Sequence, residues 1–187
     1  LFIERGKEVM YKESDVVRVA KRENNNKRKY LVVNRLQGKH VPVSPKAAFD
    51  MFKSLADTIR EEYKDDNLLL VGFAETATGI AEYLTYKLSL DKEYKNTIVY
   101  HLQTSRENYS DCPKLFTFDE EHSHAVNQYL YSKNFLPKYD KVLFVDSGYA
   151  CYRDEMLDVF RKILPEFDTM EKTILVTHAD VDHCGLL

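Results

Sequence analysis

The sequence has few cysteines and no long apolar run. Its three cysteines, Cys112, Cys151 and Cys184, are odd in number and widely spaced, which argues against a disulfide framework or a structural zinc knuckle. No apolar stretch approaches the roughly 20 residues that cross a bilayer. The opening LFIERGKEVMYKESD carries charges where a signal peptide would have its apolar core. We therefore expect a cytoplasmic protein with reduced thiols and no membrane partner.

The sequence also lacks an excess of one charge. It has 27 basic and 30 acidic residues, for a net charge of -3, which gives no overall reason to expect nucleic acid as a partner. Its 187 residues, 44% of them hydrophobic, suit one globular domain or one and a half, with a sizeable core. Because the chain starts with Leu1 and ends inside a motif, we expect a fragment open at both ends.

Apolar patterning predicts an α/β fold with a mostly parallel sheet flanked by helices. Brief apolar runs predict strands at 30–34, 68–73 and 97–104. Between them, Ser44 and Pro45 start a helix that continues over 46–63, and another helix begins near Thr78. This alternation implies parallel strands with crossover helices. The residues expected in the central strands are Leu31, Val33, Leu69, Val71, Val99, Leu143 and Val145.

The second half of the chain is less regular. Residues 105–134 interrupt the alternation and predict a hairpin followed by a short helix. The alternation then resumes with a strand and turn in KYDKVLFVDSG, a helix over 153–163 and a strand in KTILV. The strand 142–145 is expected to join the same sheet, because the residues after it are too few for an independent layered fold.

Three polar segments are candidates for binding a phosphorylated ligand. In LLLVGFAETATGI, the small-residue loop 72–79 joins a buried strand to a helix, where backbone N–H groups bind phosphates. The alternative is a tight turn with Thr76 or Thr78 as the helix cap. In QTSRE, residues Thr104, Ser105 and Arg106 offer hydroxyls and a guanidinium at the end of the next strand. The alternative there is a solvated loop with a surface arginine.

The third segment, FDEEHSHA, gathers carboxylates and imidazoles. Glu120, Glu121, His122 and His124 could bind Mg²⁺ with a diphosphate, perform acid–base chemistry or form an exposed charged turn.

Four segments resemble the orotate phosphoribosyltransferase-like family. They are KYLVVNRLQGKHVPVSPKAAFDMFKSLADTI, LLLVGFAETATGIAEYL, YHLQTSRE and FDEEHSHA, and together they span about residues 28–132. The resemblance implies a parallel sheet, exchange of a base and diphosphate on phosphoribosyl diphosphate with Mg²⁺, a small phosphorylated substrate, and allows a homodimer. It also implies a phosphate and substrate site formed by Lys39, His40, Glu75, Thr76, Ala77, Thr78, Gly79, Thr104, Arg106, Glu121, His122 and His124.

One segment departs from the family pattern. Such enzymes hold the ribose 5-phosphate in a loop with two acids, small residues and Thr-Thr-Gly, after a later strand. Here VLFVDSGYACYRDEM has one acid directly after its apolar run, no Thr-Thr-Gly, and the bulky Tyr149 and Tyr152. We therefore expect a protein that binds phosphoribosyl diphosphate or a nucleotide and is inactive or incomplete as a transferase.

The last segment resembles the opening half of a metallo-β-lactamase-fold hydrolase. DSG at 146–148 and THADVDHCG at 177–185 carry this resemblance, which covers about residues 139–187. His178 and Asp180 stand two apart and can face one metal, while the adjacent Asp182 and His183 can reach a second. The resemblance implies Zn²⁺ or another divalent metal if the site is completed. Ordinary turn-forming His and Asp residues are the alternative.

These observations predict two regions and leave three functions open. Residues 1–134 are expected to form a phosphoribosyltransferase-like domain, and residues 135–187 an incomplete metallo-β-lactamase-like segment. The chain is then a phosphoribosyltransferase-like protein, a truncated metal-dependent hydrolase, or a non-catalytic nucleotide-binding module. Because further metal ligands would come from downstream, we expect at most a weak metal site at the carboxyl end.

Overall fold

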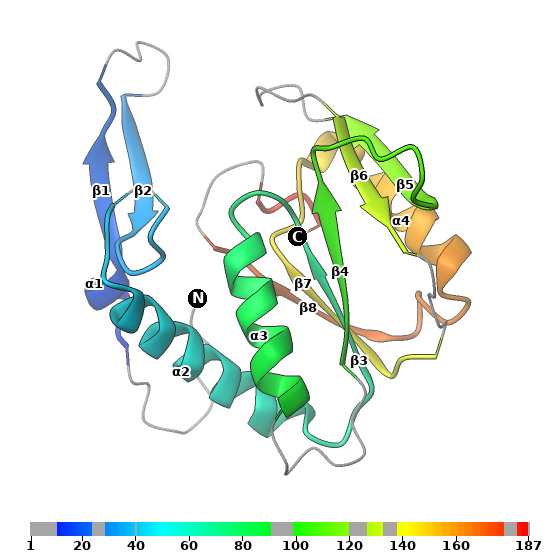
Figure 1. The fold of residues 1–187 in the computed structure, drawn as a ribbon, viewed down its shortest axis with the longest axis horizontal. Helices are drawn as coiled ribbons and strands as arrows, with labels where there is room; N and C mark the ends of the chain where they lie inside the picture. Colours follow the sequence, from blue (N-terminus) through cyan, green and yellow to red (C-terminus); the bar gives the residue numbers. More distant parts are fainter. Residues whose placement is uncertain are drawn as a thin grey trace.

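The computed structural model describes residues 11–23, 29–39, 41–90, 99–119, 127–132, 138–177 and 183–186. Its main element is a six-stranded sheet in the order β5-β6-β4-β3-β7-β8 (Figure 1). The parallel strands are β3 (Leu68–Gly72), β4 (Val99–Ser105), β7 (Lys141–Val145) and β8 (Glu171–Leu175). Two antiparallel strands, β5 (Lys114–Asp119) and β6 (Asn127–Tyr131), complete one edge. The expected α/β fold with a mostly parallel sheet is confirmed.

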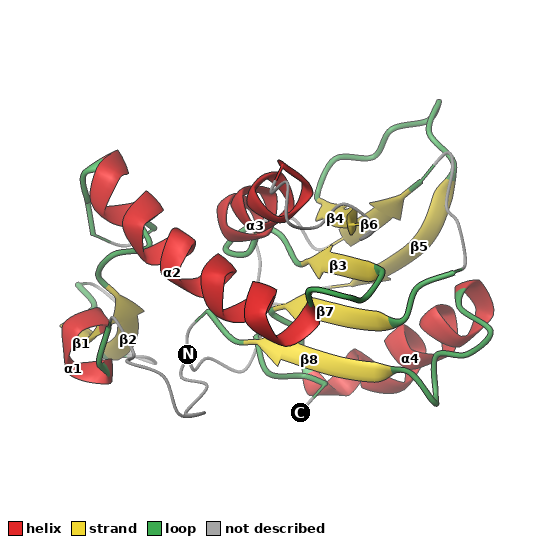
Figure 2. Ribbon diagram, turned by 90° about the horizontal axis from the view of Figure 1, so that it is seen from below, coloured by secondary structure: helices red, strands yellow, loops and turns green. Residues whose placement is uncertain are grey.

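Both faces of the sheet are covered, and the strand sequences show why. Every residue of β3 is buried. Leu68 and Leu70 point to a core shared with α2 (Pro45–Tyr63) and α3 (Thr78–Leu90). Leu69 and Val71 point to a second core shared with α4 (Arg153–Ile163) and the antiparallel edge. Figure 2 shows α4 apart from α2 and α3. A continuous apolar run is therefore required in β3, because successive side chains enter opposite cores.

The predicted helices over residues 46–63 and 153–163 are both present. Ser44 caps α2, since its Oγ accepts a hydrogen bond from the Ala47 N–H at 3.2 Å, and Pro45 occupies the first turn. The buried side of α2 consists of Ala48, Met51, Phe52, Ala56, Ile59 and Tyr63. The predicted helix over residues 153–163 is α4, which follows the short 3-10 helix η1 (Ala150–Tyr152). Among the described helices, none is long and apolar enough to cross a membrane.

A separate hairpin corrects one prediction. The short helix α1 (Glu13–Val16) leads into β1 (Val17–Lys21), which pairs with β2 (Tyr30–Asn34) in a two-stranded antiparallel sheet. The placement of Leu31 and Val33 in the central sheet was therefore wrong. Their ladder partners come from β1, the nearest strand along the chain, and both edges of β3 are occupied by β4 and β7.

The irregular region after β4 was predicted in part. The expected hairpin is present as β5 and β6, but the expected short helix was wrong over residues 127–131, which form β6. Gln128 and Leu130 are buried while their neighbours are more exposed, so the segment alternates with the period of a strand. The strand 142–145 joins the main sheet beside β3, as expected. The division of the chain at about residue 134 stays a prediction.

Gly72 allows α3 and β4 to approach the end of β3. A Cβ atom at this position would lie 2.8 Å from Ala81 Cβ and would also meet the Gln103 side chain. We expect Gly72→Ala to lower the free energy of unfolding by about 1–3 kcal/mol, because the helix must shift away from the sheet.

Gly79→Ala is the matched control, because no heavy atom lies within 4 Å of its added Cβ. It should leave stability unchanged or raise it by up to about 1 kcal/mol through a less flexible unfolded chain. Urea unfolding of both variants measures the difference, and equal midpoints would contradict the packing argument.

Candidate functional site

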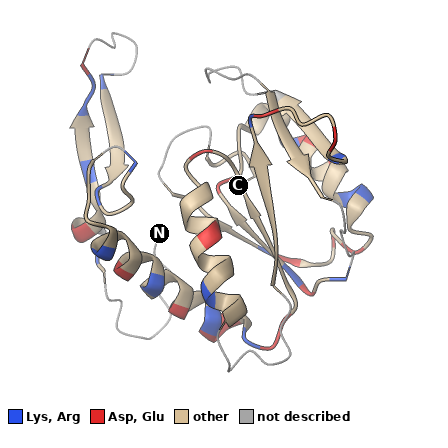
Figure 3. Ribbon diagram, viewed as in Figure 1, with Lys and Arg blue, Asp and Glu red and all other residues tan. Residues whose placement is uncertain are grey.

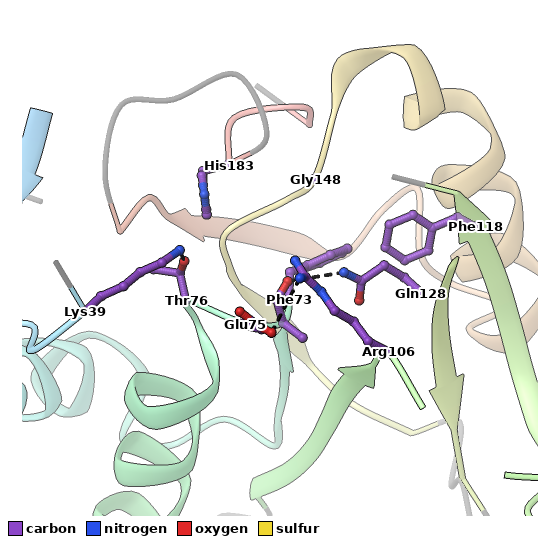
Figure 4. Close-up of a pocket in the computed structure, with 10 residues that line it drawn as sticks. Lys39, Phe73, Glu75, Thr76, Arg106, Phe118, Gln128, Gly148 and His183 are labelled. Atoms are coloured by element: carbon purple, nitrogen blue, oxygen red, sulfur yellow. Dashed lines mark hydrogen bonds and ion pairs between the residues drawn. The ribbon is translucent and has the colours of Figure 1, made fainter. Parts of the chain in front are cut away.

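A crevice forms where the chain leaves β3 and β7 in opposite directions. After β3 the chain enters α3 on one face of the sheet, and after β7 it enters α4 on the other. The carboxyl ends of neighbouring parallel strands separate at such a point, where ligands of open α/β sheets bind. A small cavity of about 30 Å³ lies here (Figure 4), lined by Lys39, Phe73, Ala74, Glu75, Thr76, Arg106, Phe118, Gln128, Gly148 and His183.

A larger cavity adjoins the first and shares Lys39, Glu75 and Thr76 with it. Its volume is about 290 Å³, and its other lining residues are Gln37, Gly38, Phe52, Gly79 and Ile80. The segment between β2 and α2 therefore contributes one wall, and the start of α3 contributes another.

The loop after β3 is held by the two strands beside it. The Ala74 N–H donates a hydrogen bond to Thr104 Oγ1 at 2.7 Å, and the Gln128 side-chain amide donates to the Ala74 carbonyl at 3.4 Å. The peptide bond between Ala74 and Glu75 is cis. The Thr78 N–H donates to the Glu75 carbonyl at 3.1 Å, which begins the turn into α3. Strands β4 and β6 thus position a backbone loop at the amino end of a helix.

Gln103 on β4 also holds this turn into α3. Its side-chain amide donates to Thr78 Oγ1 at 3.3 Å, and its carbonyl oxygen lies 3.2 Å from His101 Nε2. Burial lowers the pKa of His101, so this imidazole is neutral near pH 7 and donates Nε2–H to Gln103. The chain His101, Gln103, Thr78 therefore consists of neutral groups, and positive charge at the crevice comes from elsewhere.

Two cationic side chains flank the loop. An Arg106 guanidinium nitrogen lies 3.4 Å from Glu75 Oε1, with the Arg106 side chain 20% exposed and the Glu75 side chain 68% exposed. The Lys39 ammonium donates to Thr76 Oγ1, and the Gln37 amide donates to the Thr76 carbonyl at 3.2 Å. Two cations beside the amino end of α3 form an environment that favours an anion.

The loop after β7 is closed by the last described residues. Asp146 is 0% exposed and has a φ of 61°. Its carboxylate accepts hydrogen bonds from the Thr177 N–H and the Thr177 hydroxyl, both at 2.8 Å, and His183 Nδ1 lies 2.7 Å from Asp146 Oδ2. Ser147 Oγ donates to the His183 carbonyl and accepts from the Leu186 N–H, both at 3.1 Å. These contacts bring His183 into the wall of the small cavity.

A close backbone approach completes this closure. The Gly185 N–H donates to the Gly148 carbonyl at 2.9 Å, and a Cβ atom on Gly185 would lie 2.5 Å from that carbonyl oxygen. Only glycine lets the two backbones lie this close.

The described site residues that the sequence predicted fall into two groups. Lys39, Glu75, Thr76, Gly79 and Arg106 line the cavities together. Behind them, Thr104 and Thr78 hold the loop, and Ala77 is fully buried in the core. Their roles in ligand binding stay predictions.

Seven other predicted residues lie outside the described part of the chain: His40, Glu121, His122, His124, His178, Asp180 and Asp182. Among the described residues, no group of three or more His, Cys, Asp or Glu side chains could hold a metal ion.

The sequence did not identify Gln128, Phe118 and Phe73 as part of the cavity wall. Gln128 is 1% exposed and lies on the inward side of β6. A polar residue at an inward position of an alternating strand was the available signal, and reading this segment as a helix concealed it.

Comparisons with known proteins agree with this geometry. A family model described as phosphoribosyl transferase matches residues 16–183. The adenine phosphoribosyltransferase of Giardia lamblia, solved with 9-deazaadenine, superposes with a TM-score of 0.51 at 13% identity, covering 85% of this chain and 80% of that one. The adenine phosphoribosyltransferase of Rhodothermus marinus gives a TM-score of 0.48 at 8% identity, covering 86% and 93%. No curated protein matches. The Giardia structure shows the shared fold.

Thr177→Val tests the closure around Asp146. The substitution removes a hydroxyl donor from a fully buried carboxylate, so we expect the free energy of unfolding to fall by about 1–3 kcal/mol. The amide of Leu186 should also exchange faster with solvent, because its acceptor Ser147 lies in the same cluster.

Thr169→Val provides the control, since the Thr169 hydroxyl donates to the Glu166 carbonyl at an exposed position. It should change stability by less than about 0.5 kcal/mol. Chemical unfolding and hydrogen exchange measure both effects, and equal losses in the two variants would count against a structural role for the cluster.

Proposed function

The chain belongs to the phosphoribosyl transferase family, whose model spans residues 16–183, and we propose that it binds phosphoribosyl diphosphate or a nucleotide in the crevice described above. The observation that carries this proposal is the position of Arg106 and Lys39 on either side of the loop that starts α3. Phosphate oxygens are the ligands that a helix amino end, a guanidinium and an ammonium bind together.

The proposed binding mode exchanges one partner of Arg106 for another. Its guanidinium contacts Glu75, whose carboxylate is largely exposed. A diphosphate carries more negative charge than one carboxylate and accepts two parallel hydrogen bonds from an arginine. We propose that the diphosphate takes the place of Glu75 at Arg106, while Lys39 turns from the Thr76 hydroxyl toward a phosphate oxygen.

The rest of the ligand would occupy the larger cavity. Its volume of about 290 Å³ is close to the lower end of small-molecule sites, roughly 300–1,000 Å³. Phe52 and Ile80 offer apolar surface there, and Gln37 offers hydrogen-bonding groups, which suits a sugar or a planar base.

Mg²⁺ is the cofactor that fits this arrangement. Proteins usually bind it through one or two carboxylates together with substrate phosphates, because the ion keeps much of its water shell. Glu75 is an exposed carboxylate beside the proposed diphosphate position, so it could hold the ion once Arg106 has turned to the ligand. When bound, the ion would neutralise charge on the diphosphate. The predicted contributions of Glu121, His122 and His124, the homodimer and the cytoplasmic location stay predictions.

We propose binding without complete transfer. The loop after β7 occupies the place where the family resemblance puts the ribose 5-phosphate, yet Asp146 and Ser147 are each 0% exposed. Their side chains are engaged by Thr177, His183 and Leu186. Engaged in this way, the side chains of Asp146 and Ser147 offer a 5-phosphate no donors, which supports an incomplete site and the interpretation as a nucleotide-binding module.

A second candidate function is metal binding by the carboxyl-terminal motif. One contact between the two motifs favours it: Asp146 of DSG and His183 of THADVDHCG lie together, with 2.7 Å between Asp146 Oδ2 and His183 Nδ1. A carboxylate at one imidazole nitrogen commonly orients the other nitrogen toward a metal. His183 would then serve through Nε2, with His178, Asp180 and Asp182 as the other ligands of Zn²⁺ or another divalent ion, in a site still incomplete as a hydrolase.

Arg106→Ala tests the first candidate. Hydrogen bonds to charged groups contribute about 1.5–3 kcal/mol each, so the affinity for phosphoribosyl diphosphate with Mg²⁺ should fall by about tenfold to a hundredfold. Calorimetric titration measures the change. Arg153→Ala is the matched control, because that arginine is exposed at the start of α4, where its guanidinium lies 3.8 Å from Asp154. Equal affinity in the wild type and both variants would contradict the proposal.

A diphosphate-release assay, run with saturating phosphoribosyl diphosphate and a panel of nucleobases, separates binding from turnover. We expect binding in the titration and no release above the uncatalysed rate. Release would overturn the incomplete-transferase part of the proposal and leave the binding part intact.

Zn²⁺ titration tests the second candidate. His183→Ala should weaken Zn²⁺ binding by about tenfold to a hundredfold, as the loss of one site partner commonly does. His101→Gln removes a histidine outside the motif and should leave the affinity unchanged. If both histidine variants bind Zn²⁺ as tightly as the wild type, the carboxyl-terminal motif is not the metal site.

A further inference from the structure

The β1–β2 hairpin concentrates positive charge in a protein that is acidic overall. Residues 17–35 contain seven of the 27 basic residues and one of the 30 acidic residues, so this segment carries a charge of +6 and the remainder carries -9. Figure 3 shows basic residues along β1 and at the ends of β2. The net charge of -3 therefore averages two regions of opposite sign.

The hairpin also places an aromatic side chain beside these charges. In the antiparallel register Lys21 lies opposite Tyr30, and Val19 lies opposite Val32, so the four side chains share one face. Tyr30 is 65% exposed and Val19 is 70% exposed. The backbone of Arg22 continues the ladder, since its N–H donates to the Lys29 carbonyl at 2.8 Å. Arg22 and Lys29 pair at the next position of the ladder, so their side chains lie on the opposite face from Lys21 and Tyr30. The outer half of the hairpin is therefore a ribbon with basic side chains on both faces and one exposed tyrosine.

No described carboxylate neutralises the charges on the outer half. Within the part of the chain that the structure describes, the side chains of Lys21, Arg22 and Lys29 form no ion pair with a described carboxylate. Arg18 differs, because its guanidinium donates to the Ser14 and Val17 carbonyls at 2.5 and 2.8 Å and so folds back toward α1. The candidate contact residues are thus Lys21, Arg22, Lys29 and Tyr30.

We propose that this ribbon binds single-stranded nucleic acid. Lysine and arginine bind the phosphates of a strand, and an exposed aromatic ring stacks on an unpaired base, which together form the usual platform for such strands. Five residues of β-strand extend about 16 Å, which is long enough to follow several phosphates. The proposed site contacts the sugar-phosphate backbone of the nucleic acid and stacks on one base. We therefore expect it to bind strands of different nucleotide sequence equally well.

Charge separation selects this partner over an anionic membrane. Figure 1 shows the hairpin at one side of the molecule, apart from the six-stranded sheet. A broad anionic surface would meet the acidic remainder of the protein as well as the hairpin and would be repelled by it. A narrow strand contacts the hairpin alone.

The test compares a triple variant of the hairpin with a triple variant elsewhere. Lys21→Ala, Arg22→Ala and Lys29→Ala together should weaken binding of a fluorescein-labelled single-stranded oligonucleotide by at least about tenfold, measured by fluorescence anisotropy. The dependence of log K on log salt should fall by about 2, because each lost phosphate contact to a single strand contributes roughly 0.7. Lys46→Ala, Lys53→Ala and Lys162→Ala remove the same charge from exposed helix positions and should change the affinity by less than about twofold.

Two substitutions of Tyr30 test the proposed stacking on a base. Tyr30→Ala should weaken binding by about tenfold, whereas Tyr30→Phe should retain it, because the ring and not the hydroxyl stacks. Tyr86→Ala removes a tyrosine of similar exposure, 63% against 65%, from α3 and should have no effect. The single substitution Lys29→Glu, which leaves the hairpin pairing unchanged, weakens binding as well and serves as the second variant if the triple variant fails to fold by circular dichroism.

Three results would overturn the proposal. The first is no binding of the oligonucleotide by the wild-type protein at low salt. The second is an equal loss in the hairpin and helix triple variants, which would indicate a general charge effect. The third is binding of phosphatidylserine-containing vesicles in place of the oligonucleotide.

Discussion

The buried carboxylate of Asp146 is the constraint on which the crevice depends. A carboxylate with no solvent access is tolerated only when polar groups surround it; here Thr177 donates two hydrogen bonds to it, and His183 Nδ1 lies 2.7 Å from it. Asp146 follows β7, Thr177 follows β8, and His183 lies beyond both, so one side chain ties three parts of the chain to the same edge of the sheet. The close approach of Gly185 to Gly148 follows from this arrangement, and so does the position of His183 in the cavity wall.

The same carboxylate determines what each side of the crevice can do. On the β7 side, polar side chains form hydrogen bonds within the protein: the Ser147 hydroxyl bonds to the His183 carbonyl and to the Leu186 N–H. On the β3 side, Arg106 contacts the exposed carboxylate of Glu75 and Lys39 contacts the hydroxyl of Thr76, and ion pairs and hydrogen bonds of this kind at a partly exposed position are readily exchanged. The proposed anion site therefore lies beside α3. For this reason the chain can belong to the phosphoribosyl transferase family and still lack, as proposed, a complete binding site for the ribose 5-phosphate.

Local signals predicted the fold well, and pairing between strands limited the rest. The helix over 46–63 could be predicted because Ser44, Pro45 and the apolar spacing all act within the helix itself. The strand 30–34 was also predicted, but its partner was not, because an isolated run of apolar residues does not reveal whether β1 or β3 lies beside it. At the site, Glu75 and Arg106 could be expected to meet, since both follow parallel strands at one edge. Gln128 was missed, because the prediction of a helix concealed the strand alternation that places its polar side chain on the inward side of β6.

The net charge of the whole chain does not describe the local charge of the β1–β2 hairpin, which lies apart from the main sheet. In about 0.1 M salt, charges further apart than roughly 10 Å are largely screened from one another. The acidic groups of the sheet region therefore do not cancel the basic groups at the outer half of the hairpin, and the two regions act on partners separately. The same segment that carries the hairpin continues from β2 through Gln37 to Lys39 in the crevice wall. The two proposed anion sites thus lie at both ends of one short stretch, and a net charge near zero is compatible with two separate anionic partners.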